Sequence, residues 1–508
     1  MGNIKRREFI KQCGIGAGAL LTANIWSQTL FADPAKGFTA PDYQQLFGIT
    51  KEEMKKLLEI ALSKGGDFSD LFFEYRLSTS LTYEEDIVRS SSENITLGVG
   101  IRVLNNDQTG YAYTNDLTFD KIKQTCLTAA AIASGSSKYK VANFNDLKVN
   151  AKLYDLGEPL SKLGLDEKIK LIKQGYDAAK NYDKKITKVS SFLADEIQIV
   201  TIANSDGVFV TDVRPQARLS VVANAEENGN KSSGYKSAGG RIGYNFYKNE
   251  SLPKNIGLEA SKEAIILLEA KEAPGGEYPV VLKAGDSGVM IHEAVGHPLE
   301  GDSAWKKQTI MWDKVGEMVA NPLLTIYDDA TIPNYRGTMS VDDEGTKTEN
   351  VVLIEKGKLI GFLNDKLAAR MLKANANGHG RRETYQNVPI PRMNNTVLAN
   401  GTSEHDEILK DVKKGFYAIS YQGGQVSNTG KFTFSVNLGY LIENGKLTQP
   451  LKNCTLIGSN IQILKDVDMV GNDIGFFLGT CGKEGQSVPV TAGTPTLRIK
   501  KMTVGGVA

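Results

Sequence analysis

The sequence predicts an α+β protein in which N-terminal α/β units precede a large antiparallel, β-rich C-terminal domain that carries a histidine-bearing helix. Helix-period apolar stripes alternate with strand-like runs over the first half of the chain. Hairpin-like repeats with a glycine at the turn dominate after residue 275. The 51 glycines are typical of a protein with many turns and close backbone approaches. A length of 508 residues exceeds one ordinary domain, so we expect two or three.

Residues 1–32 are typical of a secretory signal peptide. A basic segment, KRREFIK, precedes an apolar stretch from Cys13 to Trp26, and Ala32 is a suitable cleavage position. The pair Arg6-Arg7 resembles the twin-arginine export signal. We therefore expect an exported, periplasmic protein. An uncleaved N-terminal membrane anchor is the alternative. The apolar stretch is short for a membrane span and no second span follows it, so we do not expect stable membrane insertion.

The first α/β unit is expected over residues 48–136. Thr50 and Glu53 form a capping-box pattern at the start of an amphipathic helix. Strand-like runs follow at 70–78, 80–88 and 93–114, the last with a hairpin turn between Asn105 and Thr109. Residues 118–135 then predict a helix that turns Cys126 inward, where a buried, inert thiol is the favoured interpretation.

A second α/β unit is expected over residues 150–272. Helical patterns at 165–183 and 254–273 flank strand-like segments, and Asp206-Gly207 is a strong hairpin signal. The stretch GNKSSGYKSAGGR, residues 229–241, predicts an exposed glycine-rich loop. No phosphate-type helix start follows this stretch, so it does not predict a nucleotide site.

The third body, residues 275–508, is expected to be β-rich. The segments 351–365 and 438–451 predict hairpins with a glycine at each turn. Two helices interrupt this pattern, one at 364–376 and one within DSGVMIHEAVGHPLEGD, residues 286–302. Asp286 or Ser287 is placed to cap the second of these helices.

This second helix holds two of the four histidines in the chain, His292 and His297, with Glu293 directly after the first. The zinc-protease pattern H-E-x-x-H places its histidines four residues apart on one helix face. Here the spacing is five, and five steps of about 100° leave the two side chains roughly 140° apart. A π-bulge could bring them together, or the helix could end near Gly296 and Pro298. Two nearby histidines with a core or capping role remain the alternative.

A catalytic zinc site needs a third protein ligand. Cys481, in the glycine-rich stretch FFLGTCGKEGQSVP, is a candidate third ligand, because the neighbouring glycines let the backbone approach a metal site closely. Three cysteines after the signal do not form a disulfide framework. The formal net charge of +1 gives no support to nucleic-acid binding.

The segment HEAVGHPLEGD resembles the metal motif of the TldD/PmbA metallopeptidases. The resemblance continues through SDGVFVTDVRPQARL, NGHGRRETYQNVPIPRMNNT, GGQVSNTGKFTF and GTCGKEGQSVPVTAGTPTLRIKKMTVGG, and it covers about residues 48–508. The chain looks like the metal-bearing, TldD-type subunit. The resemblance implies a peptidase that acts on unfolded or small peptide substrates. It also implies a homodimer, or a heterodimer with a PmbA-type subunit, that encloses a cavity.

By position, the resemblance implies Zn²⁺ as cofactor, His292, His297 and Cys481 as its ligands, and Glu293 as the catalytic carboxylate. Cys454 does not match a ligand position and is interpreted as structural, and no function is expected for His405. Glu300 and Asp302 could hydrogen-bond the ligand imidazoles or could be solvated carboxylates.

The segment GHGRRETY supplies candidate substrate-binding residues: His379, Arg381, Arg382 and Tyr385. Their side chains could hold a peptide carboxylate or an oxyanion, and a structural arginine cluster is the alternative. A non-catalytic binding or assembly subunit is the alternative for the whole chain. Four intact residues of metal-site type argue against that alternative.

Overall fold

The computed structural model describes residues 42–154, 163–248, 251–427 and 429–506. The predicted signal peptide, residues 1–32, lies outside these ranges, so its prediction is not addressed by the structure. Among the helices in these ranges, none is both long enough and apolar enough to cross a membrane.

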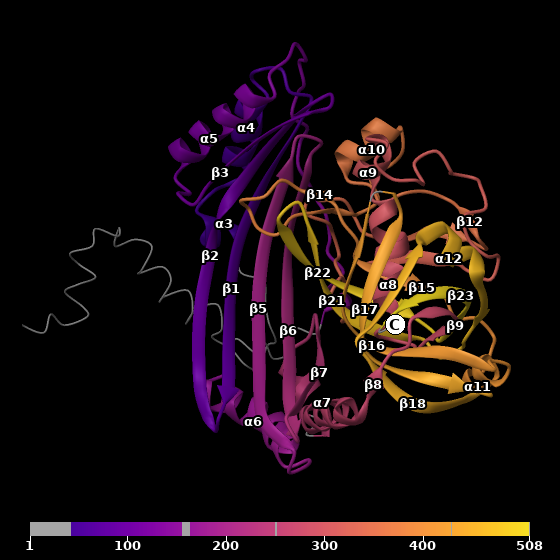
Figure 1. The fold of residues 1–508 in the computed structure, drawn as a ribbon. Coiled ribbons are helices and arrows are strands. Elements are labelled where there is room, and N and C mark those ends of the chain that lie inside the picture. The colour runs from indigo at the N-terminus through magenta and orange to yellow at the C-terminus, as the bar shows by residue number, and fades with distance from the viewer. Residues whose placement is uncertain (1–41, 155–162, 249–250, 428, 507–508) are drawn as a thin grey trace, which may run out of the picture.

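A seven-stranded sheet dominates the first half of the chain and contains strands of 17 to 20 residues (Figure 1). Its strand order is β3-β2-β1-β5-β6-β4, and β7 pairs with β6. The bounds are β1 Phe68–Glu84, β2 Ile87–Asn105, β3 Gln108–Thr114, β4 Asn145–Asp146, β5 Ile186–Asn204, β6 Val208–Glu227 and β7 Asn230–Gly240. Because β1 pairs with β5, the strands of both predicted N-terminal units join one continuous sheet.

Two pairs of helices pack against opposite ends of this sheet. At one end, α4 (Lys51–Ala61) and α5 (Phe119–Ile132) form one apolar core with the sheet, following the short α3 (Tyr43–Phe47). At the other end, α6 (Leu165–Lys180) and α7 (Ser251–Glu269) form a second core. Short 3₁₀ turns lie at η1 (Ala151–Leu153) and η3 (Tyr244–Tyr247). The predicted capping box of α4 is confirmed, since Thr50 and Glu53 bond reciprocally.

The hairpin turns predicted near Asn105 and Asp206 are confirmed, but two local predictions are wrong. The runs 70–78 and 80–88 are not separate strands, because β1 continues to Glu84 and turns into β2 at residues 85–86. Residues 229–241 do not form a loop, since most of them form β7. Gly234 of β7 allows α7 to pack closely, because a Cβ at this position would lie 2.1 Å from the Ala260 carbonyl oxygen of α7.

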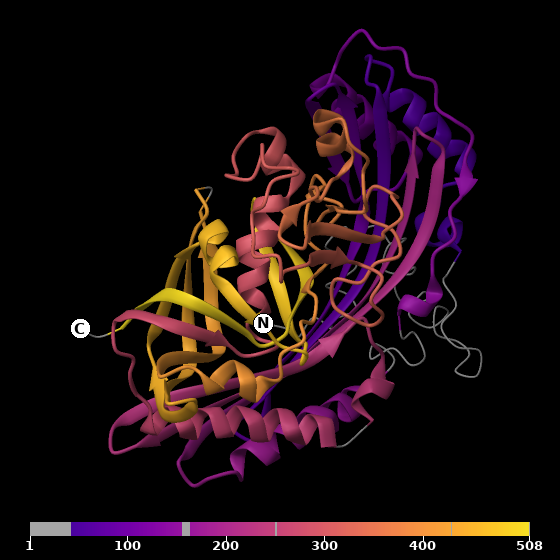
Figure 2. The ribbon, with the colours of Figure 1, turned by 90° about the vertical axis from the view of Figure 1, so that its right-hand side faces the viewer.

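The C-terminal half lies in the concavity of the long sheet (Figure 2). One of its sheets has the order β16-β9-β23-β19-β17-β18-β8, with β20 paired to β23. Because β16 also pairs with β17, five strands close into a ring. The bounds are β8 Lys271–Glu272, β9 Gly276–Leu282, β16 Lys414–Val426, β17 Lys431–Glu443, β18 Lys446–Lys452, β19 Cys454–Ser459, β20 Val467–Val470 and β23 Leu497–Gly505.

A six-stranded sheet of order β12-β11-β10-β15-β22-β21 lies beside this ring. The bounds are β10 Ile326–Asp329, β11 Asn350–Glu355, β12 Lys358–Leu359, β15 Asn395–Leu398, β21 Gly475–Lys483 and β22 Gln486–Thr494. A small pair, β13 (Gly380–Arg381) and β14 (Ile390–Pro391), completes the strands. The helices are α8 (Gly288–Ile291), α9 (Gly301–Trp305), α10 (Lys366–Leu372), α11 (His405–Lys410) and α12 (Asn460–Asp466). The α+β class is therefore confirmed, and the domain boundaries stay a prediction.

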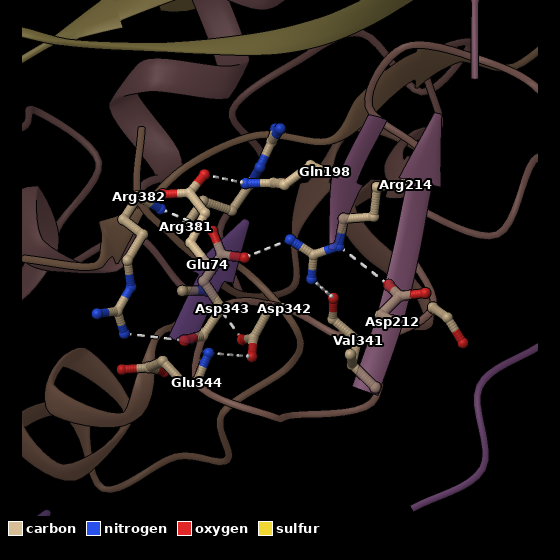
Figure 3. Close-up of polar contacts among 12 residues, drawn as sticks. Glu74, Gln198, Asp212, Arg214, Val341, Asp342, Asp343, Glu344, Arg381 and Arg382 are labelled. Atoms are coloured by element: carbon tan, nitrogen blue, oxygen red, sulfur yellow. Dashed lines mark hydrogen bonds and ion pairs between the residues drawn. The ribbon is translucent and has the colours of Figure 1, made fainter. Parts of the chain in front are cut away.

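Buried charge joins the two halves. Arg214 of β6 donates to Asp212 at 2.9 Å, to Asp343 at 2.5 Å and to the Val341 carbonyl at 2.8 Å (Figure 3). Burial would raise the pKa of Asp343, but Arg214 and Arg382 lower it. All partners are removed from water, so these contacts are weakly screened and set the position of one half on the other.

We expect Arg214→Met to lower the free energy of unfolding by about 3–5 kcal/mol, because Asp343 and Asp212 would stay buried without this counter-charge. Chemical denaturation measures the loss. Lys173→Met is the matched control, since its pair with Asp177 is exposed and should change the same quantity by about 0.5 kcal/mol or less. Equal effects of the two substitutions would contradict the structural role of Arg214.

The loss should also depend on pH. Because the folded-state pKa of Asp343 is lowered, its ion pair contributes stability above the unfolded pKa of about 3.9, and this contribution is lost as the pH falls below that value. The stability difference between wild type and Arg214→Met should therefore be largest near neutral pH and narrow below about pH 4.

Candidate metal centre

The two histidines of the motif lie on a π-helical turn. The α8 helix continues directly into η4 (His292–Gly296), which is π-helical, and then into the 3₁₀ turn η5 (His297–Leu299). The backbone N–H of His297 donates to the carbonyl of His292, five residues earlier. Of the two devices that the sequence allowed, the structure contains the π-helical one, and such turns occur mostly at functional sites. The predicted N-cap position is confirmed at Ser287, but its hydroxyl makes no capping hydrogen bond and instead contacts the hydroxyl of Tyr421 at 2.9 Å.

This turn brings the two imidazoles together. Their ring centroids are 4.9 Å apart with an interplanar angle of 79°. Cys481 joins them: its Sγ lies 3.3 Å from Nε2 of His297. One nitrogen from each histidine and the sulfur all lie within 4.8 Å of one another. The structure thus places in one group three side chains that the sequence separates by up to 189 positions.

Gly296 is needed for a packing reason. Its φ of −56° is open to any residue, but a Cβ at this position would lie 1.8 Å from the sulfur of Met393. Met393 is fully buried in the core of the C-terminal half. Gly288 plays a similar part, because a Cβ there would lie 2.6 Å from the Ala492 carbonyl oxygen of β22. The helix therefore lies closer to β22 and to Met393 than side chains at these two positions would permit.

Cys481 lies on β21, the edge strand of the six-stranded sheet, opposite Val488 of β22. Its carbonyl accepts a hydrogen bond from Nη2 of Arg392 at 2.5 Å. Burial would raise the pKa of the Cys481 thiol, but His292 and then His297 lower it to about 4. The arrangement therefore favours the thiolate, which is the form that binds a metal.

A second layer of charge orients His297. Its Nδ1 lies 3.0 Å from Oε2 of Glu300, and Nζ of Lys483 lies 3.1 Å from the same carboxylate. Burial would raise the pKa of Glu300, but Lys483 and His297 lower it to about 2. Asp302 contacts Lys483 at 2.7 Å. Glu300 thus contacts an imidazole directly, whereas Asp302 reaches it only through Lys483 and Glu300.

Glu293 and the three grouped side chains line a cavity of about 520 Å³. Burial raises the pKa of the Glu293 carboxyl, while His292 and His297 oppose the rise. Residues 423–426 of β16 and the following Ser427 also line this cavity. The cavity therefore combines a carboxyl of raised pKa with a group of soft donors.

The donor set fits a zinc ion. Zinc prefers nitrogen and sulfur ligands in tetrahedral geometry, with about 2.0–2.3 Å to each ligand atom. Donor atoms within 4.8 Å of one another can meet one ion at such distances. In addition, Nδ1 of His292 is buried without a hydrogen-bond partner among the described residues. Three protein donors leave a fourth position for water or substrate, as in catalytic zinc sites.

The four predicted substrate-binding residues lie elsewhere: His379 and Arg381 bond within the C-terminal half, whereas Arg382 and Tyr385 contact the long sheet. His379 is buried between Asp328 and Asn377, at 3.1 and 2.9 Å. The Arg381 guanidinium donates to the carbonyls of Met393 and Pro489.

Arg382 pairs with Asp70 at 3.1 Å. It also donates to the Asp343 carbonyl at 2.9 Å (Figure 3). The buried Tyr385 accepts at its carbonyl from the Tyr111 hydroxyl at 2.6 Å. None of the four lines the cavity of the grouped side chains, so their substrate role stays a prediction.

The sequence reasoning missed three residues around the site: Met393, Arg392 and Lys483. Arg392 and Met393 lie in the segment PIPRMNNT, and Lys483 follows Cys481 by two positions, but their spacing carries no metal signal. The other cysteines match their interpretation, since Cys126 and Cys454 are buried and burial raises the pKa of each to about 12. His405 opens α11 and is partly exposed.

Comparison with protein families matches three consecutive segments of the chain. Residues 69–133 match the PmbA/TldA metallopeptidase domain 1, residues 158–268 match the central domain, and residues 275–506 match the C-terminal domain. These three segments together span more than half of the chain.

Individual proteins match over nearly the same length. A Haemophilus influenzae protein named metalloprotease TldD homolog is 38% identical over 90% of this chain and 97% of its own length. A Saccharolobus solfataricus protein named zinc metalloprotease TldD homolog is 26% identical over 89% of this chain and 100% of its own.

Among solved structures, a Thermotoga maritima protein has a TM-score of 0.74 and 24% identity over 90% of this chain and 100% of its own. TldE from Thermococcus kodakarensis has a TM-score of 0.70 and 18% identity over 89% of this chain and 100% of its own. These structures share the fold.

We expect Gly296→Ala to lower the free energy of unfolding by about 1–3 kcal/mol and to weaken metal binding, because the added methyl would overlap Met393 and push the π-turn off its position. Denaturation and titration with Zn²⁺ measure the two effects. Gly482→Ala is the matched control beside Cys481, since a Cβ there meets no atom within 4 Å. Unchanged zinc affinity in Gly296→Ala would show that the π-turn does not depend on this contact.

Proposed function

Because the chain belongs to the PmbA/TldA metallopeptidase family, we propose that it is a zinc-dependent peptidase that hydrolyses peptide bonds in unfolded or small peptide substrates. The observation that carries the proposal is the convergence of His292, His297 and Cys481 beside Glu293 in one cavity. The name of the Saccharolobus solfataricus relative supports zinc as the metal.

In this proposal His292, His297 and Cys481 hold the ion. A bound zinc ion supplies a Lewis acid that polarises a carbonyl and activates water for attack. Glu300 and Lys483 keep the His297 ring in a single orientation, with Nε2 turned toward the Cys481 sulfur. The buried side chains of Cys481 and His292 form part of the cavity wall.

Glu293 is the proposed general base and acid. It takes the proton of the attacking water and returns it to the departing amine. A raised pKa suits this double role, because proton transfer in both directions is most efficient when the pKa lies near the working pH. The carboxyl lines the cavity one position after His292, so it is within the same confined space as the donor group.

A cavity of about 520 Å³ supports an extended or unfolded substrate, since a folded domain could not bring its backbone to buried side chains. A non-catalytic subunit is the other candidate function. The intact donor group and Glu293 favour catalysis over it.

We also propose assembly as a homodimer, or as a heterodimer with a PmbA-type subunit, that encloses a cavity around the site. Exposed apolar side chains near β12, including Met318, Leu323 and Ile360, support a subunit contact in this region. Light scattering on the purified chain, alone and with a PmbA-type protein, distinguishes the two forms. A monomer in both samples would contradict the proposal.

We expect about one zinc ion per chain by elemental analysis, and we expect Cys481→Ala to lower the zinc content or affinity at least tenfold. The substitution removes one of three donors and the negative charge of the thiolate. Cys454→Ala is the matched control, because it also removes a buried thiol of the C-terminal half but lies outside the donor group. Unaltered zinc content in Cys481→Ala would rule out the ligand assignment.

We expect Glu293→Gln to retain zinc and to lower kcat for an unfolded substrate by about 10²–10⁴-fold, since the amide cannot carry the proton. A protease assay with an unfolded protein, together with elemental analysis of the same sample, measures both properties. Undiminished cleavage would exclude Glu293 as the base.

We propose further that residues 1–32 direct export to the periplasm through the twin-arginine route. The basic pair Arg6-Arg7 and the apolar stretch that follows it support this proposal. Replacing both arginines by lysine should leave the protein in the cytoplasm, as cell fractionation and immunodetection would show. Unchanged periplasmic protein in the double variant would exclude a twin-arginine signal.

A further inference from the structure

A second cavity, of about 900 Å³, adjoins the cavity of the donor group. The two share wall residues that include Val289, Gly479 and Thr480. The second cavity lies between β7 of the long sheet and β16 and β21 of the C-terminal half, so both halves of the chain contribute to it. Aromatic side chains such as Tyr335 and Phe476, with ring centroids 4.3 Å apart, form part of its apolar wall.

Of the charged residues in this wall, Arg218 is the cation without a counter-charge. Lys236 lies 3.9 Å from Asp286. Glu263 accepts hydrogen bonds from Ser420 at 2.5 Å and from Asn437 at 2.6 Å. Arg218, in contrast, forms no ion pair with a carboxylate of any described residue: it donates to the Ser237 hydroxyl and to the Leu478 carbonyl.

A second arginine increases the positive charge at this place. Arg336 donates to the carbonyl of Gly479 at 3.1 Å, next to the carbonyl that Arg218 contacts. It too has no carboxylate ion-pair partner in the described ranges, and Glu196, whose charge acts on it, pairs instead with Arg76 at 3.7 Å. Burial and then Arg218 lower the pKa of Arg336 to about 10. Buried positive charge without compensation favours an anion at the accessible guanidinium.

The position of Arg218 relative to the donor group follows from the strand. Leu478 precedes Cys481 by three residues on β21. An extended strand advances about 3.3 Å per residue, so the two positions are about 10 Å apart. This distance equals about three residues of an extended peptide lying beside β21.

We propose that Arg218 anchors an anion-binding subsite that takes a carboxylate of the peptide substrate, about three residues from the scissile bond. The carboxylate belongs either to an Asp or Glu side chain or to the C-terminus of the peptide. The guanidinium is already oriented by Ser237 and the Leu478 carbonyl, and its Nη1 makes no hydrogen bond to a described residue. This inference rests on the peptidase function proposed above. The subsite would give that peptidase a preference for peptides with an acidic side chain or a free C-terminal carboxylate.

Binding to the zinc-loaded Glu293→Gln protein tests the subsite without cleavage. The probes are short, labelled peptides that differ only by Glu against Gln at one position, moved stepwise along the peptide, and the same peptides with a free or amidated C-terminus. We expect the peptide with the carboxylate at one position to bind roughly tenfold more tightly than its amide counterpart. Whether that position is a Glu side chain or the free C-terminus shows which carboxylate the subsite binds. In Arg218→Gln the ratio should fall to about one, and Arg218→Lys should retain part of it.

Lys236→Gln is the matched control, because it removes a positive charge from the same wall but should leave the affinity ratio unchanged. Peptides that bind without a carboxylate preference, or that do not bind, overturn the proposal, as does a preference that survives in Arg218→Gln. A cleavage assay on the wild-type chain, which retains Glu293, tests the proposed function separately. If this chain binds acidic peptides in preference but cleaves none, the proposed function is refuted and the subsite remains as a binding site.

Discussion

The hydrogen bond from the backbone N–H of His297 to the carbonyl of His292 is the constraint on which the candidate metal centre depends. A regular helix would turn these side chains about 140° apart. The wider π-turn brings their rings to 4.9 Å and leaves room for Cys481 between the helix and β21. Contacts outside the turn hold it in place, because Gly296 packs against the sulfur of Met393 and a 3₁₀ turn that contains Pro298 follows directly.

Charge around the centre is arranged in layers. The imidazoles favour the thiolate of Cys481, and Glu300 with Lys483 fixes the ring of His297. Arg392 holds the backbone of Cys481 and also lies 3.9 Å from Glu300. The side chains that hold the donor group therefore come from three separate segments, and each segment constrains the others.

The long N-terminal sheet contributes to the same region from the opposite side. Its buried pairs, such as Arg214 with Asp343 and Arg102 with Glu344, set the C-terminal half in the concavity of the sheet. As a consequence β7 and β21 face each other across the larger cavity, and Arg218 of β6 reaches a carbonyl of β21. Substrate access to the donor group is thus determined by both halves of the chain.

By itself, the sequence determined the α+β class, the capping box at Thr50, the hairpin turns near Asn105 and Asp206, and the candidate donors His292, His297 and Cys481. These follow from local periodicity, turn chemistry and residue type, which act over a few positions. It did not determine that β7 is a strand, because Gly234 permits the close approach of α7 and does not mark a turn. Nor did it determine which device joins the two histidines, or that Arg382 and Tyr385 contact the long sheet while His379 and Arg381 bond within the C-terminal half. Only the tertiary structure decided those points, because packing of Met393 on Gly296 and pairing of charges over a hundred or more positions leave no local pattern.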